Sequence, residues 1–153
     1  MAKATQRQIV AKISPVVDVP GHIPGPEFPK YFATVSGGEI SASVEKVYDG
    51  NSTFPEVLCA PAEIGDITVS KFYDPETDGD DDHAKLTSLR QLVGMTYYDI
   101  IIYTTNCELK VPGSERTYAK ALLVGLTEPD GDASSGAPAA YSLTFSVSTV
   151  AAI

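Results

Sequence analysis

The clearest structural signal in the sequence is the alternating stretch Tyr141-Ser142-Leu143-Thr144-Phe145-Ser146-Val147-Ser148. Every second side chain is large and apolar, and the residues between are serine or threonine. Successive side chains of a β-strand point to opposite faces of the sheet, so this period of two predicts a strand with one face in a core and the other in water. An apolar run, Ala121-Leu122-Leu123-Val124-Gly125-Leu126, and a polar loop over 128–136 precede it. Together they predict two strands joined by that loop.

Further strands are predicted upstream. Two extended runs within residues 30–48 flank Ser36-Gly37-Gly38, which predicts a hairpin turn at that point. The second run alternates, with a polar face formed by Glu39, Ser41, Ser43 and Glu45. Residues 65–73 alternate again and place Thr68 and Ser70 on the polar face. Residues 95–105 are apolar on both faces, which predicts a central strand that is covered on both sides.

One amphipathic helix is predicted over about 80–93. Leu86, Leu89 and the pair Leu92/Val93 share a helical face, and Gly94 is a fitting C-cap. Acidic residues at 80–82 lie where they would cap the helix N-terminus. The pattern indicates an outer helix of about three turns that packs on a sheet.

The acidic run before the helix has a partial likeness to a calcium-binding EF-hand loop. The acids and the glycine at 74, 76, 78, 79, 80 and 82 match ligand or turn positions, but Lys85 stands where a bidentate glutamate is needed. A strand, not a helix, is predicted before the loop. We therefore expect a solvated loop with capping acids and no metal.

A proline-rich segment occupies residues 15–29. Its five prolines and two glycines exclude a helix or a central strand. It nevertheless carries five large apolar residues, namely Val16, Val17, Val19, Ile23 and Phe28. We expect residues 1–29 to form an extended N-terminal arm and loop, with a short strand near Ile9–Ile13, that becomes ordered against a neighbouring subunit.

Composition narrows the function further. A chain of 153 residues with 43% hydrophobic content suits one domain, and a net charge of −9 disfavours nucleic-acid binding. No apolar stretch reaches the roughly 20 residues of a membrane span, and the first residues lack a secretion signal. Cys59 and Cys107 are expected to be free buried thiols. No motif for catalysis or cofactor binding occurs, so we expect no enzyme and no cofactor.

Three segments resemble the major tail tube proteins of long-tailed bacteriophages. They are Val17-Asp18-Val19-Pro20-Gly21 through Tyr31-Phe32-Ala33-Thr34-Val35-Ser36-Gly37-Gly38-Glu39-Ile40; Ala62-Glu63-Ile64-Gly65-Asp66-Ile67-Thr68-Val69 followed by Asp74-Pro75 and the helix; and the closing pair of strands, 121–130 and 141–148. The resemblance covers most of the chain, but its motifs are short and structural.

The resemblance implies a two-sheet antiparallel β-sandwich with one flanking helix. It also implies rings of six copies that stack into a tube through which double-stranded DNA passes, in a virion tail assembled in the host cytoplasm. The implied partners are further copies and the tape measure, tail terminator and baseplate or tip proteins. Of the two kinds of tail, we expect the non-contractile one.

Within such a tube, we expect the polar face of Glu39, Ser41, Ser43, Glu45, Thr68 and Ser70 to line the lumen. Acids there would repel the phosphates of DNA. If each subunit gives about four strands to a shared barrel, six give roughly 24, with a backbone radius of about 24 Å. The alternative is an all-β adhesive or carbohydrate-binding module.

Overall fold

Seven strands of the chain form one antiparallel sheet in a computed structural model that describes residues 3, 8–17, 20–21, 23–48, 50, 53–74, 81–106, 109–111 and 113–148. The strands pair in the order β1-β8-β10-β11-β7-β2, and β9 pairs with β8 beside this path. Their bounds are β1 Ile9–Pro15, β2 Thr34–Gly37, β7 Ile67–Phe72, β8 Tyr97–Asn106, β9 Leu109–Lys110, β10 Arg116–Thr127 and β11 Ala140–Ser146.

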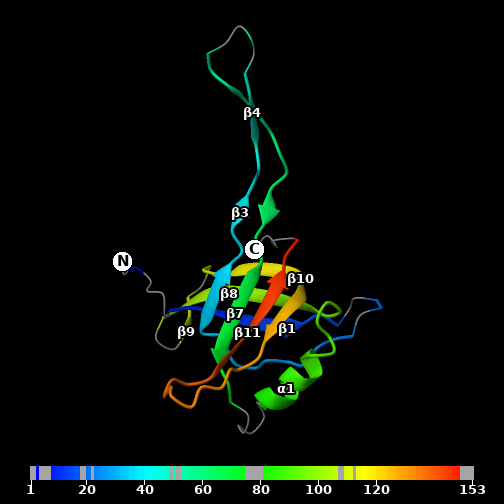
Figure 1. Ribbon diagram of the computed structural model, residues 1–153, viewed down its shortest axis with the longest axis vertical. Coiled ribbons are helices and arrows are strands. Elements are labelled where there is room, and N and C mark those ends of the chain that lie inside the picture. The colour runs from blue at the N-terminus through cyan, green and yellow to red at the C-terminus, as the bar shows by residue number, and fades with distance from the viewer. Residues whose placement is uncertain are drawn as a thin grey trace.

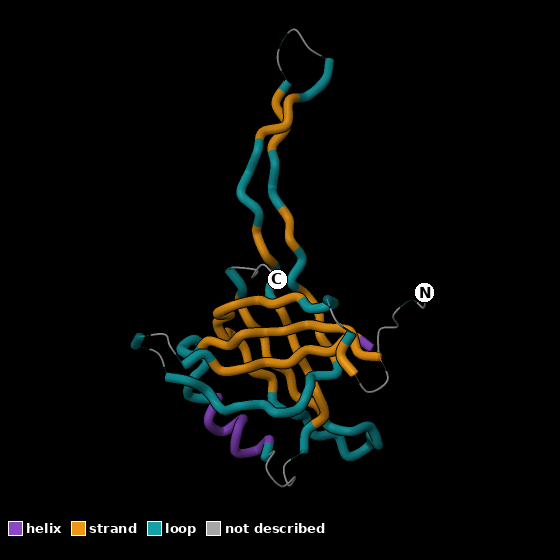
Figure 2. The backbone as a smooth tube through the Cα atoms, turned by 180° about the vertical axis from the view of Figure 1, so that it is seen from behind, coloured by secondary structure: helices purple, strands orange, loops and turns teal. Residues whose placement is uncertain are grey.

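The sheet curls into two layers at β10. The first part of this strand pairs with β8 and its second part with β11, and the register shifts between Tyr118 and Ala121 and again between Leu123 and Gly125. Lys120, within the first of these shifts, has a φ of 52°. Bulges of this kind bend a strand and increase its twist, which lets β10 pass from one layer to the other. Figures 1 and 2 show that β2, β7 and β11 cross β1 and β8.

The two edges of the curled sheet meet. The backbone N–H of Ala11 in β1 donates to the carbonyl of Phe32, and the N–H of Phe32 donates to the carbonyl of Ala11, at 3.1 and 2.7 Å. Phe32 lies just before β2, the strand at the opposite edge. The predicted mainly-β fold with one helix is confirmed, and its two layers belong to one continuous sheet.

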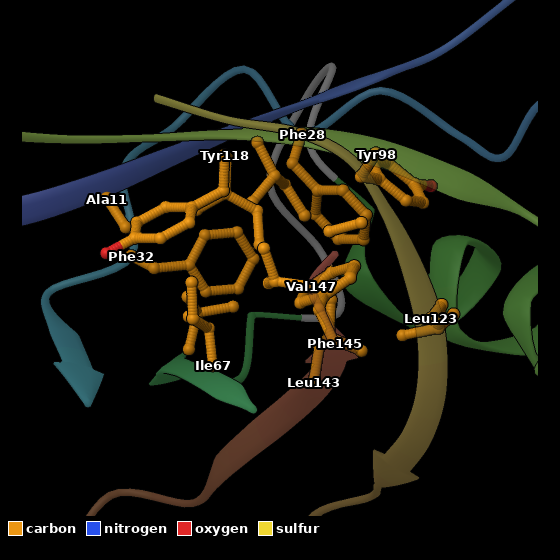
Figure 3. Packing of buried hydrophobic residues seen from close by; sticks show 14 of the residues in the cluster. Ala11, Phe28, Phe32, Ile67, Tyr98, Tyr118, Leu123, Leu143, Phe145 and Val147 are labelled. Atoms are coloured by element: carbon orange, nitrogen blue, oxygen red, sulfur yellow. The ribbon is translucent and has the colours of Figure 1, made fainter. Parts of the chain in front are cut away.

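The core lies between the layers (Figure 3). Aromatic rings dominate it: Phe28 lies 5.5 Å from Phe32, and Tyr98 lies 5.7 Å from Phe145, between ring centroids. Leu86 and Leu89 bring the helix onto this core. The inward side chains of β7 and β11 are, except for Lys71, the apolar members of the alternating stretches, as their period of two predicts.

The helix α1 spans Asp82–Leu89 and is shorter than predicted. Leu86 and Leu89 are buried as expected, but Leu92 and Val93 lie in turns and are half-buried. Gly94 has a φ of 83°, and its N–H donates to the Leu123 carbonyl at 2.6 Å. The helix therefore ends early because the chain turns before Gly94 and makes a hydrogen bond to β10 at that residue.

The short strand predicted near Ile9–Ile13 is confirmed, but the N-terminal arm expected around it requires a correction. Residues 9–15 form β1, which pairs along its whole length with β8. Phe28 is buried in the chain's own core, and the Tyr98 hydroxyl donates to the Pro26 carbonyl at 2.8 Å. A Cβ atom at Gly25 would overlap that hydroxyl. The proline-rich segment thus finds its partner within the same chain, at a tyrosine that the sequence pattern did not single out.

The hairpin turn predicted at Ser36-Gly37-Gly38 is wrong. Gly37 and Gly38 have φ values of 93° and 78°, and they redirect the chain out of the sheet without reversing it. A Cβ at Gly37 would overlap the Asp66 carbonyl oxygen, so glycine is needed where the outgoing and returning chains pass. Residues 38–48, 50 and 53–66 belong to a long two-stranded projection, called the arm below (Figure 1). Its strands are β3 Ile40–Ser41, β4 Glu45–Val47, β5 Glu56–Leu58 and β6 Glu63–Ile64, with β3 paired to β6 and β4 to β5.

Candidate assembly surfaces

The arm exposes large apolar side chains along its length. They are Ile40, Val44, Val47, Tyr48, Phe54, Val57 and Leu58, and Phe54 is 80% exposed. An isolated two-stranded hairpin is marginally stable in water, and large apolar side chains exposed along it are typical of an interaction site. Because these side chains are exposed in the single subunit, the arm is suited to lie on another protein surface.

The arm also carries most of the residues predicted to line a lumen. Glu39, Ser41, Ser43 and Glu45 are all exposed there. Glu56 and Glu63 lie on the returning strands, so acidic side chains outnumber Lys46, the single base in the described part of the arm. The structure therefore brings four of the six predicted lumen residues together, beyond the body of the sheet.

Thr68 and Ser70, the other two, lie on the outward face of β7. Their neighbours across the strands are also hydroxyl residues. One row runs Thr34–Ser70–Ser142–Thr127 and the next runs Ser36–Thr68–Thr144–Gly125 across β2, β7, β11 and β10. The Thr68 and Thr144 hydroxyl oxygens lie 3.3 Å apart. We call this surface the hydroxyl face.

The outward face of the other layer has a different chemistry. It presents Val10 and Tyr103 side by side, then Lys12 beside Ile101, with Tyr97 beside Leu122 on the neighbouring strand pair. The ring of Tyr31 packs edge-on against Tyr103 at 5.9 Å between centroids. Residues 95–105 were predicted to form a strand that is covered on both faces. The surface described here is the second face of that strand, β8, and its Tyr97 and Ile101 are half-buried within the single subunit.

The residues predicted to contact another subunit are distributed unevenly. Val17 and Ile23 are exposed, at 67% and 56%, whereas Val16 is half-buried and Phe28 is buried. Val19 lies outside the described residues. Val17 and Phe28 border an open groove together with Lys12 and Glu27. Only the exposed pair is therefore available to a neighbour.

The start of α1 holds a buried ionic network that sequence reasoning missed. Asp81 is the N-cap, as its position predicts, and accepts from the Ala84 N–H at 3.2 Å. Asp82 is fully buried and accepts from the Tyr141 hydroxyl at 3.1 Å and from the Asp74 N–H at 2.8 Å. The Lys71 ammonium lies 3.5 Å from the same carboxylate. The signal in the sequence was Lys71 itself, a charged residue on the apolar register of an alternating strand.

No group of three or more potential metal-binding side chains occurs among the residues that the structure describes. Positions 75–80 of the acidic run, and with them several of the EF-hand-like acids, lie outside that part of the chain. Within the described ranges, no helix is long and apolar enough to cross a bilayer.

The cysteine prediction was partly wrong. Cys59 is a free thiol, but it is exposed on the returning strand of the arm and not buried. The arm has no core of its own, so a residue there stays in contact with solvent. Cys107 lies outside the described residues.

Comparison with known proteins finds likeness in fold. No family model matches the sequence, and no curated protein matches it. A chain of the sheath–tube complex of an extracellular contractile injection system, PVC, superimposes with a TM-score of 0.69 at 22% identity, covering 97% of this chain and 90% of that chain. A chain of the six-fold symmetrised baseplate of the anti-feeding prophage gives 0.71 at 17% identity, over 99% and 95%. A chain of the PVC sheath/tube terminator gives 0.68 at 22%, over 99% and 96%. Along nearly its whole length, the chain thus has the fold of these chains from the PVC and anti-feeding prophage particles.

Proposed function

We propose that this chain is a structural subunit whose copies close into six-membered rings, and that these rings stack into the tube of a tail-like particle. The observation that carries the proposal is the likeness in fold, which extends over 97% of the chain, to a component of a sheath–tube complex. The six-fold symmetry of the anti-feeding prophage baseplate supports the number of subunits in a ring.

The layer β2-β7-β11-β10 is the proposed tube wall. It offers four neighbouring strands, the number assumed above for the contribution of each subunit to a shared barrel. Six such layers give roughly 24 strands and a backbone radius of about 24 Å, which leaves a bore of about 40 Å. In this arrangement the hydroxyl face, with Thr68 and Ser70, lines the lumen. The lumen role of Glu39, Ser41, Ser43 and Glu45 stays a prediction, because these residues lie on the arm.

The arm is the proposed link between subunits. Covering its apolar side chains on a neighbouring copy would remove them from water, at about 25 cal/mol per Å² of apolar surface. The contact is heterologous, since an arm on one copy meets a different surface on the next, and contacts of this type generate rings or helical stacks. Val17 and Ile23, exposed on the body, are further candidates for the same contact.

The finer role rests on the sequence resemblance. It favours a phage tail tube that conducts DNA and that contacts a tape measure, a terminator and a baseplate during assembly in the host. The PVC chains with this fold come from a contractile injection system, so they support a tube subunit and give no support to the non-contractile form. Isolation of native particles with or without a sheath protein would distinguish the two.

Electron microscopy of the purified protein tests the proposal. We expect rings or tubes with six-fold symmetry, and we expect Val57→Asp on the arm to abolish them because it charges an exposed apolar contact. Ser88→Asp on the exposed side of α1 is the matched control and should assemble normally. A wild-type protein that stays monomeric at high concentration and with its particle partners present would overturn the proposal and favour the adhesive or carbohydrate-binding alternative.

A further inference from the structure

The hydroxyl face is uncharged. Its outward positions hold eight hydroxyl residues on four strands: Thr34, Ser36, Thr68, Ser70, Thr127, Ser142, Thr144 and Ser146. The other outward positions are apolar or glycine, such as Phe72, Ala140 and Gly125. Among residues 34–37, 67–72, 122–127 and 140–146, Lys71 is the single charged residue, and it points inward to Asp82.

This neutrality does not follow from composition. The chain is 20% charged and carries a net charge of −9. Its acids gather elsewhere, on the arm at Glu39, Glu45, Glu56 and Glu63, and around the start of α1. The outward face of the other layer carries Lys12, Asp99 and Lys120. Charge therefore surrounds the hydroxyl face but is excluded from it.

Hydroxyl groups give such a face a particular behaviour. Each can both donate and accept a hydrogen bond, so the surface holds water without a net field. Charged side chains would act on a passing polymer over a Debye length of about 10 Å at 0.1 M salt, a large part of the proposed bore radius. A wall of hydroxyl groups therefore neither attracts nor repels the passing polymer by charge.

Building on the proposed function, we propose that the tube wall is a hydrated hydroxyl surface that does not select its cargo by the sign of the cargo's charge. A wall of this kind differs from the acid-lined bore that the sequence predicted. The negative charge of the chain then acts at the arm and at the outer parts of the subunit.

Charged thiol reagents measure the potential at the wall directly. In a background with Cys59→Ser and Cys107→Ser, Ser142→Cys places one thiol at the centre of the hydroxyl face. Cationic and anionic methanethiosulfonates are applied to assembled tubes, and each rate is divided by the rate of the same reagent with free cysteine. We expect equal normalised rates that do not change with salt. Ser70 pairs with position 142 across the strands. Adding Ser70→Asp should therefore make the cationic reagent react faster at low salt, which shows that the assay detects a charge at the wall.

The outcomes separate the inference from the function on which it rests. A salt-sensitive preference of about tenfold or more for either reagent in the parent tubes would overturn the uncharged wall. Equal labelling in tubes and in unassembled protein would show that the face is not enclosed, which also overturns it. Failure to form tubes, with circular dichroism unchanged, would count against the proposed function alone. Ser146→Cys, exposed at the end of β11, repeats the measurement if Ser142→Cys disturbs the fold.

Discussion

Asp82 has no solvent exposure, and its carboxylate is held by Lys71, Tyr141 and the backbone of Asp74. Removing one partner of a buried ion pair leaves the other charge without compensation. We expect Asp82→Ala to lower the free energy of unfolding by about 3–5 kcal/mol in urea titrations. The matched change Asp81→Ala removes only the exposed N-cap and should cost about 0.5–2 kcal/mol. Equal losses for the two variants would mean that the buried network adds nothing beyond helix capping.

Tyr103 provides a prediction at alkaline pH. Burial, followed by the neighbouring Tyr31, raises the pKa of Tyr103 to about 12. The folded chain therefore favours the neutral phenol, so its contribution to stability is complete below a pH of about 10 and is lost as the pH rises through about 12. Tyr31→Phe should lower the pKa of Tyr103 while leaving it above the ordinary value, because burial is the larger cause.

Ultraviolet titration of tyrosinate measures this shift. Subtracting the curve of each protein's Tyr103→Phe partner isolates the single residue. Tyr48→Phe, which changes an exposed tyrosine on the arm, is the control and should leave the Tyr103 curve in place. An unchanged Tyr103 curve in Tyr31→Phe would contradict the coupling of the two rings.

Among the elements, α1 depends on two leucines for its attachment to the sheet. Leu89 is fully buried, so Leu89→Ala should create a cavity and lower the free energy of unfolding by about 2–4 kcal/mol. Ser88→Ala, on the exposed side of the same turn, should change it by less than about 0.5 kcal/mol. Chemical denaturation of the three proteins compares them. A neutral Leu89→Ala would mean that the helix does not pack on the core.

The arm is separable from the body because it joins the sheet through one narrow crossing. Gly38 donates its N–H to the Asp66 carbonyl at 3.3 Å, and β2 and β7 are already paired below that point. Replacing residues 40–64 with a short turn should therefore leave the melting temperature near that of the full chain. Tube formation should be lost, which electron microscopy would reveal. Tubes from the armless protein would show that the link between subunits lies elsewhere.

Sequence patterns predicted the elements whose two faces differ. β7 and β11 lie where alternation placed them, since one face of each meets a core and the other meets solvent. The arm segment 40–47, which holds β3 and β4, alternates in the same way, but all of its residues are exposed in the single subunit, so alternation there does not mark a core face. The hairpin turn predicted at Gly37 and Gly38 was wrong for a related reason, because glycines with positive φ values occur at kinks as well as in turns. The hydroxyl face could be anticipated only in part, at Thr68 and Ser70, because cross-strand register joins residues from distant parts of the chain.

For the whole molecule, β1 is an integral part of the fold. It buries Ala11 and Ile13 and pairs with β8 along its full length. Deleting residues 1–25 should therefore unfold the chain, although the sequence predicted that residues 1–29 become ordered against a neighbouring subunit. Deleting residues 1–7, which precede β1, should leave the circular dichroism spectrum and the melting curve unchanged. A folded protein without residues 1–25 would show that the sheet tolerates the loss of its edge strand.

The place of β1 in the sheet has a consequence for the newly made chain. β1 ends at residue 15, but its partner β8 begins at residue 97. Ribosomes add about 5–20 residues per second, so the first strand waits for several seconds before its partner exists. During that interval Ile9-Val10-Ala11-Lys12-Ile13 is an unpaired apolar segment of the kind that aggregates. Lys12 interrupts it in the middle as a gatekeeper charge, which protects the nascent chain until β8 emerges.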